Sequence, residues 1–194
     1  MRVLVVYCHP VPESFCAAIR DTVIEALRAR GDETRLIDLY AERFDPVMPA
    51  DERRSYNQKA PADPNLAPHI ERLKWAEAIL FVYPTWWYGL PAMLKGWFDR
   101  VWATDIAFTL GKGGMITPLM RHIRKVGAIT TCGAPWWLLF LMGHPGRKTI
   151  LRGIRANCAK RCKTLFVAHY LMDTSTPESR AAFLEKVRRM VGAF

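Results

Sequence analysis

The chain alternates between segments with a strand-like pattern and longer segments with a helical pattern. Apolar runs and polar–apolar alternation predict five strands, over residues 3–7, 33–39, 78–83, 125–131 and 164–171. Apolar residues at helical spacing predict helices over residues 15–30, 68–77, 145–162 and 177–191, and another that starts after Pro91. Because strands and helices alternate, the pattern predicts an α/β three-layer sandwich with a parallel sheet of order 2-1-3-4-5.

Two further segments do not follow this alternation. Residues 40–68 are polar and rich in proline (Pro46, Pro49, Pro61, Pro64, Pro68) and too long for a plain connection, so we expect an excursion with short helices that covers one edge of the sheet. Residues 108–114 are predicted to form a glycine-rich loop that lacks the spacing of a nucleotide-triphosphate P-loop. The length of 194 residues suits one domain, residues 1–194.

The two most unusual loops follow the first and third predicted strands. One is His9-Pro10-Val11-Pro12-Glu13-Ser14, and the other is Pro84-Thr85-Trp86-Trp87-Tyr88-Gly89. In the order 2-1-3-4-5, the switch point lies between these two strands, where ligands bind in open α/β sheets. The two loops are therefore expected to form one site.

The residue types in these loops indicate which ligand the site binds. Ser14 and His9 precede a helix start, which favours an anion such as phosphate. Three consecutive aromatics offer a flat wall, and small polar groups follow the fourth strand at Thr130, Thr131, Cys132 and Gly133. The alternatives are that Ser14 is only a helix cap, that His9 is a buried histidine and that the aromatics belong to the core. A phosphate site beside an aromatic slot describes a pocket for flavin mononucleotide (FMN).

The same motifs carry a family resemblance. His9-Pro10 with Ser14-Phe15, and Pro84 to Gly89 running into Leu94-Lys95-Gly96-Trp97-Phe98-Asp99-Arg100, resemble the NAD(P)H:quinone oxidoreductase family of flavodoxin-like proteins. The resemblance implies a homodimeric flavoenzyme with a flavodoxin-like fold. It would take hydride from NADH or NADPH and pass two electrons to a quinone or similar acceptor by ping-pong kinetics. FMN is expected as the cofactor more than FAD.

The resemblance also implies particular site residues. The flavin phosphate and ribityl chain would contact His9, Ser14 and Phe15. The flavin ring would be held by Pro84, Thr85, Trp86, Trp87, Tyr88, Thr131 and Gly133. Characterised quinone reductases of the family have a tyrosine and a histidine after the fourth strand, but here that region has no tyrosine. His144 is the candidate catalytic proton donor there, with the alternative that it only precedes a helix beginning at Pro145.

A net charge of +10 requires an explanation, and much of the excess lies between Arg121 and Lys163. The alternatives are a solvated basic face or attraction of an anionic substrate such as a pyridine dinucleotide. No helix-turn-helix, zinc-finger or RNA-recognition signature accompanies the charge, so no nucleic-acid partner is expected.

Residues 126–143 contain no charged side chain, yet a strand end and a turn at residues 130–135 argue against a transmembrane helix. We expect a buried strand followed by an exposed apolar loop at residues 136–140. With the basic helix after it, that segment could dock near anionic lipid, compatible with peripheral membrane association. Some relatives in the resembled family act as regulatory subunits of potassium-efflux systems, which gives the alternative function.

The five cysteines (Cys8, Cys16, Cys132, Cys158, Cys162) are scattered and odd in number, so we expect reduced thiols and no metal site. The first apolar run is too short for the hydrophobic region of a signal peptide. The expected compartment is the cytoplasm.

Overall fold

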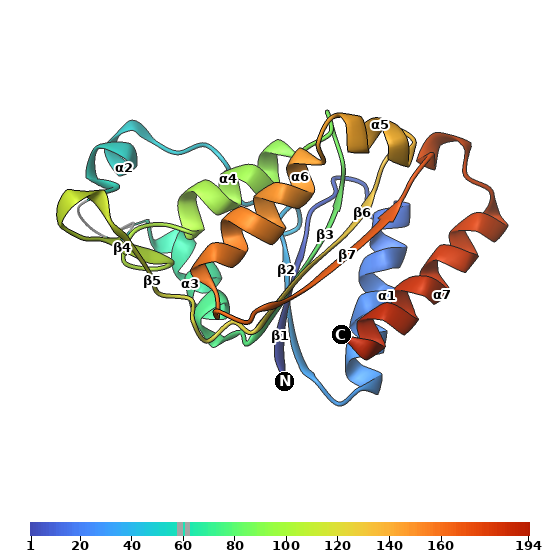
Figure 1. Ribbon diagram of the computed structural model, residues 1–194, viewed down its shortest axis with the longest axis horizontal. Coiled ribbons are helices and arrows are strands. Elements are labelled where there is room, and N and C mark those ends of the chain that lie inside the picture. Colours follow the sequence, from blue (N-terminus) through green and yellow to red (C-terminus); the bar gives the residue numbers. More distant parts are fainter. Residues whose placement is uncertain (58–59, 61–62) are drawn as a thin grey trace.

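A parallel sheet lies between two layers of helices in the computed structural model, which describes residues 1–57, 60 and 63–194 (Figure 1). The strands of the sheet are β1 (Arg2–Tyr7), β2 (Glu33–Asp38), β3 (Ala78–Pro84), β6 (Lys125–Thr131) and β7 (Lys163–His169). Their order is β2-β1-β3-β6-β7 and every pair is parallel, which confirms the predicted fold class and strand order. Pro61, one of the prolines of the expected excursion, lies outside the described residues.

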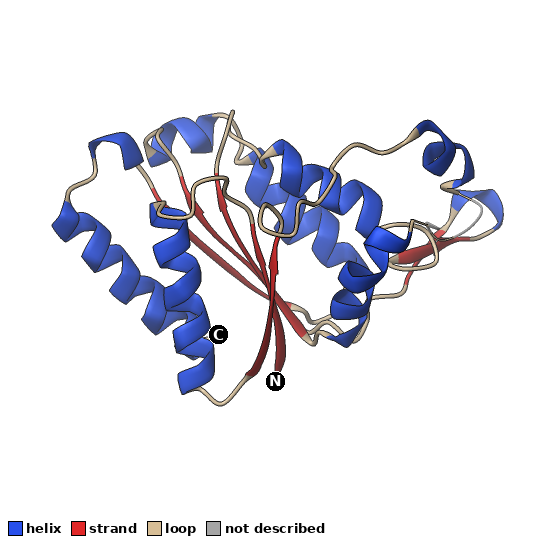
Figure 2. Cartoon of the chain, turned by 180° about the vertical axis from the view of Figure 1, so that it is seen from behind, coloured by secondary structure: helices blue, strands red, loops and turns tan. Residues whose placement is uncertain are grey.

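The strands are apolar because both faces of the sheet are covered. Along β1, Val3 and Val5 belong to one hydrophobic core, whereas Leu4 and Val6 belong to the other. The first core is covered by α1 (Phe15–Ala29) and α7 (Pro177–Ala193). The second is covered by α3 (Ala67–Trp75), α4 (Ala92–Val101) and the helical segment after Pro145, so helices flank the sheet on both sides (Figure 2).

The helix predicted over residues 145–162 is irregular and ends earlier than expected. It consists of α6 (Pro145–Lys148), a π turn η3 (Thr149–Gly153) and a 3₁₀ turn η4 (Ile154–Asn157). Another 3₁₀ turn, η5 (Met172–Thr174), follows β7.

The excursion contains short helices, as predicted: α2 (Ala50–Ser55) and the 3₁₀ turn η1 (Pro64–Leu66). It is tied to α4 by Arg100, whose buried guanidinium pairs with Glu52 and Asp63 at 2.7 Å each. Gly96 of α4 lies directly against Pro46, where a Cβ atom would overlap the backbone. One buried arginine and one glycine therefore hold this segment on α4.

Two predicted loops are regular elements instead. The expected glycine-rich loop belongs to an antiparallel hairpin of β4 (Phe108–Leu110) and β5 (Ile116–Pro118), with the 3₁₀ turn η2 (Lys112–Gly114) between them. The expected apolar loop at residues 136–140 is the helix α5 (Trp136–Leu141), which begins after Pro135. Six consecutive apolar residues have no period that distinguishes loop from helix, and three-residue strands are too short to show one. No helix among the described residues is long and apolar enough to cross a membrane.

Candidate active site

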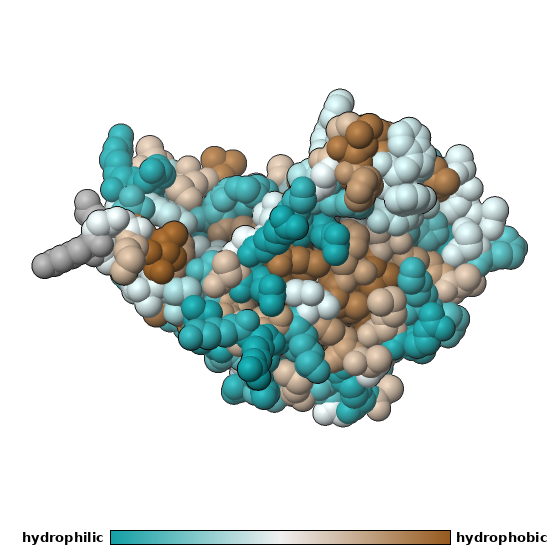
Figure 3. All heavy atoms as spheres, viewed as in Figure 1, coloured by the Kyte–Doolittle hydropathy of each residue, from teal (hydrophilic) through white to brown (hydrophobic). Residues whose placement is uncertain are grey.

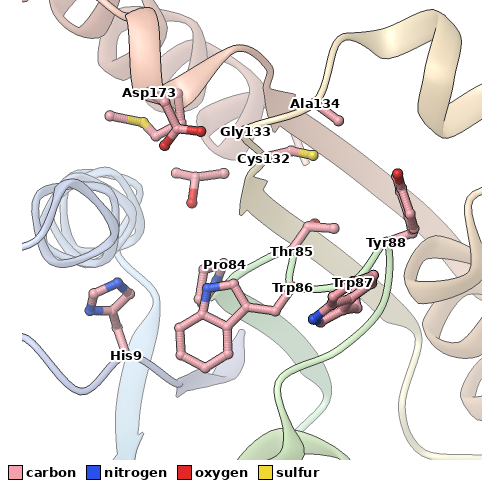
Figure 4. A pocket seen from close by; sticks show the side chains of 12 residues that line it. His9, Pro84, Thr85, Trp86, Trp87, Tyr88, Cys132, Gly133, Ala134 and Asp173 are labelled. Atoms are coloured by element: carbon pink, nitrogen blue, oxygen red, sulfur yellow. The ribbon is translucent and has the colours of Figure 1, made fainter.

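A cavity of about 800 Å³ opens at the carboxyl ends of β3 and β6, beside the loop that follows β1 (Figure 4). We call it the aromatic cavity. It is lined by His9, Pro84, Thr85, Trp86, Trp87, Tyr88, Thr131, Cys132, Gly133, Ala134, Met172 and Asp173. It therefore brings together eight of the predicted cofactor-binding residues: His9, Pro84, Thr85, Trp86, Trp87, Tyr88, Thr131 and Gly133.

The aromatic residues form a strained turn. The Gly89 backbone N–H donates to the carbonyl oxygen of Trp86 at 2.9 Å, which closes a four-residue turn. Its two central residues, Trp87 and Tyr88, both have positive φ values, 47° and 61°, as in a type I′ turn. Such positions favour glycine or asparagine, and bulky residues are held there at a cost in free energy. Because the Trp87 side chain is 94% exposed, packing does not explain its presence.

Neighbouring backbone holds this turn on both sides. The Thr85 N–H donates to the Thr131 carbonyl oxygen at 2.7 Å, and the hydroxyls of Thr85 and Thr130 lie 2.8 Å apart. On the far side, the Gly146 N–H donates to the Tyr88 carbonyl oxygen at 3.4 Å. A Cβ atom at Gly146 would lie 3.3 Å from the Gly89 carbonyl carbon, so the start of α6 packs directly on the turn.

The opposite wall comes from the loops after β6 and β7. The Cys132 N–H donates to the His169 carbonyl oxygen at 2.8 Å, and the Met172 N–H donates to the Cys132 carbonyl oxygen at 3.0 Å. The Asp173 carboxylate lies so close to Gly133 that a Cβ atom there would be 2.5 Å from Asp173 Oδ2. Figure 4 shows Asp173 and Gly133 across the cavity from His9, with the Trp86 ring beside His9. Burial raises the pKa of the Cys132 thiol, which keeps that group protonated and neutral.

His9 contributes a neutral imidazole. Its Nδ1 lies 3.1 Å from the Val11 backbone nitrogen and 3.2 Å from the Val11 carbonyl oxygen, so the Val11 backbone holds the ring in either tautomer. Burial lowers the pKa of His9, against a smaller opposing effect of the Val11 backbone. The cationic form of His9 is therefore disfavoured at neutral pH.

The structure places Ser14 and Phe15 at the start of α1, outside the cavity lining. The Ser14 hydroxyl accepts the Ala17 N–H at 3.2 Å and lies 3.3 Å from the Tyr7 hydroxyl, so it is a helix cap. The Phe15 ring packs against His169, with ring centroids 5.4 Å apart. The N–H groups of Phe15 and Cys16 have no acceptor in the part of the chain that the structure describes. These two donors remain for an anion at this helix start.

His144 lies in a neighbouring cavity, which is lined by Phe140, Gly143, His144, Arg147, Lys148, Leu151, Arg152, Arg155 and Thr164. Its backbone is left-handed, with φ of 48°, at the entry to α6. Burial, and then the charges of Arg147 and Lys148, lower its pKa. The structure therefore does not bring this predicted catalytic residue into the lining of the aromatic cavity.

The cavity residues suit a flat, anionic cofactor. Among the described residues, the N–H groups of Trp87 and Tyr88 have no acceptor, so they can donate to polar atoms at the edge of a ring. The two free N–H groups at the start of α1 suit a phosphate. The exposed rings of Trp86 and Trp87 in the cavity lining offer flat surfaces for a ring system. By these three observations, the residues present fit a flavin mononucleotide.

Sequence reasoning missed three lining residues, Ala134, Met172 and Asp173. Asp173 and Met172 follow the fifth strand of the sheet, at the same carboxyl edge as the two predicted loops. A polar residue in that loop was the available signal, because all five parallel strands end at this edge.

The fold and the cavity together define a flavodoxin-like α/β protein with a cavity at the switch point of the sheet. Residues 1–191 match the family model Flavodoxin_2, described as flavodoxin-like fold, and the chain belongs to this family.

Known relatives make the resemblance more specific. NAD(P)H dehydrogenase (quinone) 1 of Rattus norvegicus is 34% identical over 203 residues, which cover 95% of this chain and 74% of the rat protein. The chain spans about half the length of other curated relatives, such as 54% of the Cavia porcellus protein of the same name. Two solved structures superimpose on nearly all of the chain. Smu.1420 from Streptococcus mutans UA159 has a TM-score of 0.85, 29% identity and 100% coverage of both chains. An NAD(P)H:quinone oxidoreductase from Methanothermobacter marburgensis has a TM-score of 0.83 and 25% identity, with coverage of 99% and 96%.

Proposed function

We propose that this protein is a flavin-dependent NAD(P)H oxidoreductase that reduces quinones or similar acceptors by two electrons, with FMN in the aromatic cavity. The observation that carries the proposal is the strained Trp86–Gly89 turn at the switch point of a flavodoxin-like sheet. A protein with no ligand for Trp87 would gain stability by replacing it. Membership of the family, and relatives named as quinone dehydrogenases, support the same function.

The protein's contribution is to bind and orient. The bound flavin supplies the hydride-accepting chemistry. The N–H groups of Phe15 and Cys16 would hold its phosphate, and those of Trp87 and Tyr88 would hold the polar edge of its ring. The aromatic side chains exclude water from one face of the ring, which strengthens these hydrogen bonds. The hydride donor and the acceptor would occupy the same open side in turn, which is the ping-pong order.

A proton accompanies two-electron reduction of a quinone. Within the aromatic cavity, His9 carries an imidazole and Tyr88 carries a hydroxyl, and each can donate a proton. His144 lies in the neighbouring cavity, so it is not the side chain placed to donate this proton directly. A His9→Gln variant should therefore lower the rate of quinone reduction above pH 6 more than a His144→Gln variant does.

Flavin binding tests the proposal most directly. Purified protein should be yellow, or should gain a flavin spectrum on addition of FMN, and heat should release FMN identifiable by chromatography. A Trp87→Ala variant should bind FMN about tenfold more weakly, measured by quenching of flavin fluorescence, because it loses a stacking surface. The matched control is Trp136→Ala, an exposed tryptophan outside the cavity lining. Colourless protein that takes up neither FMN nor FAD would refute the proposal.

The acceptor and donor are then identified by steady-state kinetics. Both pyridine nucleotides should be assayed against several quinones. Parallel lines in double-reciprocal plots are expected, because the donor leaves before the acceptor binds. Intersecting lines would show that both substrates are bound together and would contradict the ping-pong order.

A further inference from the structure

A basic groove lies beside the aromatic cavity, along the outer side of α6 and η3. We define it by the lining of the cavity of about 500 Å³ that contains His144, Arg147, Lys148, Arg152 and Arg155. It borders β7, the last strand of the sheet, at Thr164. Figure 3 shows hydrophilic side chains lying across a hydrophobic region between the positions of α6 and β7 in Figure 1.

The positive charges of this groove are not compensated within the described residues. Four cations line it, and none of them is in an ion pair with a described carboxylate. Elsewhere the chain pairs its buried arginine, since Arg100 contacts both Glu52 and Asp63. Arg147 instead lies over the Phe166 ring at 5.3 Å, and Arg155 Nε donates to the Cys162 carbonyl oxygen at 2.9 Å. Like charges gathered in this way repel one another, so an anion bound among them is favoured.

An unpartnered polar atom lies in the same groove. His144 Nδ1 is buried and has no hydrogen-bond partner among the described residues. A buried polar atom without a partner costs free energy, which a ligand atom would recover. Burial and the charges of Arg147 and Lys148 lower the pKa of His144, so its ring is neutral and can donate a single hydrogen bond to an anion.

Gly146 joins residues of the groove to residues of the aromatic cavity. Its backbone contacts both Tyr88 and Gly89 of the aromatic turn, and Arg147 and Lys148 are the next two residues. Arg152 lies six residues after Gly146, about 9 Å farther along a helical axis. A molecule with a ring in the aromatic cavity could therefore extend its charged part along these cations.

We propose that the basic groove binds the phosphate groups of the pyridine dinucleotide hydride donor, and that it favours NADPH over NADH through the 2′-phosphate. The inference rests on the proposed function, because that function supplies the dinucleotide. The 2′-phosphate adds up to two negative charges to the donor, and four uncompensated cations interact more favourably with the donor that carries them.

Binding of adenosine 2′,5′-bisphosphate tests the groove without any turnover. Calorimetry on the flavin-loaded protein should show binding that weakens about tenfold in Arg152→Gln, which removes one charge-assisted contact. Arg152 is exposed and donates no hydrogen bond to any described residue, so its replacement should leave the fold intact. Arg161→Gln, an exposed site outside the groove, removes the same charge and should leave the affinity unchanged. Equal losses in both variants would show a mere effect of net charge and would overturn the proposal.

Kinetics and a second ligand complete the test. Arg152→Gln should raise the KM for NADPH about tenfold and the KM for NADH by less, because NADH lacks the 2′-phosphate, with little change in kcat. Two results together would overturn the assignment of the groove to the hydride donor. Inorganic phosphate would bind as tightly as the bisphosphate, and the unaltered protein would have equal KM values for NADPH and NADH. Absence of flavin uptake would instead refute the proposed function, and the same calorimetry on the flavin-free protein would still report on the groove.

Discussion

Trp87 and Tyr88 line the aromatic cavity in a backbone conformation that bulky residues rarely adopt. Both adopt the left-handed conformation that a type I′ turn requires of its central residues. Asparagine and glycine would adopt it with less strain, and the exposed Trp87 ring gains nothing from the core. Strain of this kind, in a loop that lines a cavity, is typical of a ligand site.

A double variant, Trp87→Asn with Tyr88→Gly, separates stability from binding. It should raise the free energy of unfolding by about 1–2 kcal/mol, because the turn loses its strain. FMN affinity should fall at the same time, since both side chains line the cavity. Thermal unfolding of the flavin-free protein and a flavin titration measure the two effects. A variant that is less stable than the unaltered protein would show that the turn is not strained.

Gly133→Ala should displace the Asp173 carboxylate, because the new Cβ atom would lie 2.5 Å from Asp173 Oδ2. We expect a loss of about 1–3 kcal/mol in stability and weaker FMN binding, measured by denaturant unfolding and by titration. Gly192→Ala is the matched control, since nothing lies within 4 Å of that position in α7. Alanine there should be neutral or stabilise the helix by up to about 1 kcal/mol. Equal behaviour of the two variants would contradict the packing described at Gly133.

Among single residues, those whose role depends on neighbours in the sequence, such as a helix cap, could be predicted from the sequence. The Ser14 cap was one of the alternatives considered, and its geometry bears that alternative out. Asp173 could not be assigned, because its place against Gly133 depends on how two distant loops meet. The position of His144 was likewise out of reach, since the left-handed entry to α6 turns it into the neighbouring cavity.

At the scale of elements, the strands were predicted to within two residues, and the misses share a cause. Five strands buried on both sides leave a clear apolar signal in the sequence. The β4–β5 hairpin and α5 bury little, so their sequences show neither alternation nor an amphipathic stripe. The secondary structure of exposed elements of three to six residues depends more on neighbouring elements than on the apolar pattern of their own sequence.

The attachment of the excursion to α4 should depend on pH. The Asn65 backbone N–H, and then the Arg100 guanidinium, outweigh desolvation and lower the pKa of Asp63 below its ordinary value of 3.8. A lowered pKa contributes stability that is present above the ordinary pKa and is lost as pH falls through the lowered one. Stability measured by urea unfolding should therefore fall less between pH 5 and pH 3 in Asp63→Asn than in the unaltered protein. Parallel curves for the two proteins would contradict this account.

At the scale of the whole molecule, the apolar surface gathers near the site. Exposed apolar side chains on and beside the site include Trp86, Trp87, Trp136, Trp137, Phe140, Leu141 and Met142. Contiguous apolar surface of this kind marks an interface. We propose, as the family resemblance implies, that it is covered by a second copy of the chain.

Phe140→Ser with Leu141→Ser should weaken this dimer at least about tenfold, because both side chains are about 70% exposed in the single chain. Sedimentation at micromolar concentration measures the change. Met115→Ser, at an exposed position of the β4–β5 hairpin, is the control and should remain dimeric. An unaltered protein that sediments only as a monomer would contradict the proposed dimer.

The contact between Gly146 and Gly89 has a mechanical consequence. With no side chain between the two backbones, no soft layer can absorb a displacement of one relative to the other. An anion that displaces Arg147 of α6 is therefore expected to displace the aromatic turn with it. The start of α6 thus joins the basic groove to the turn that lines the aromatic cavity.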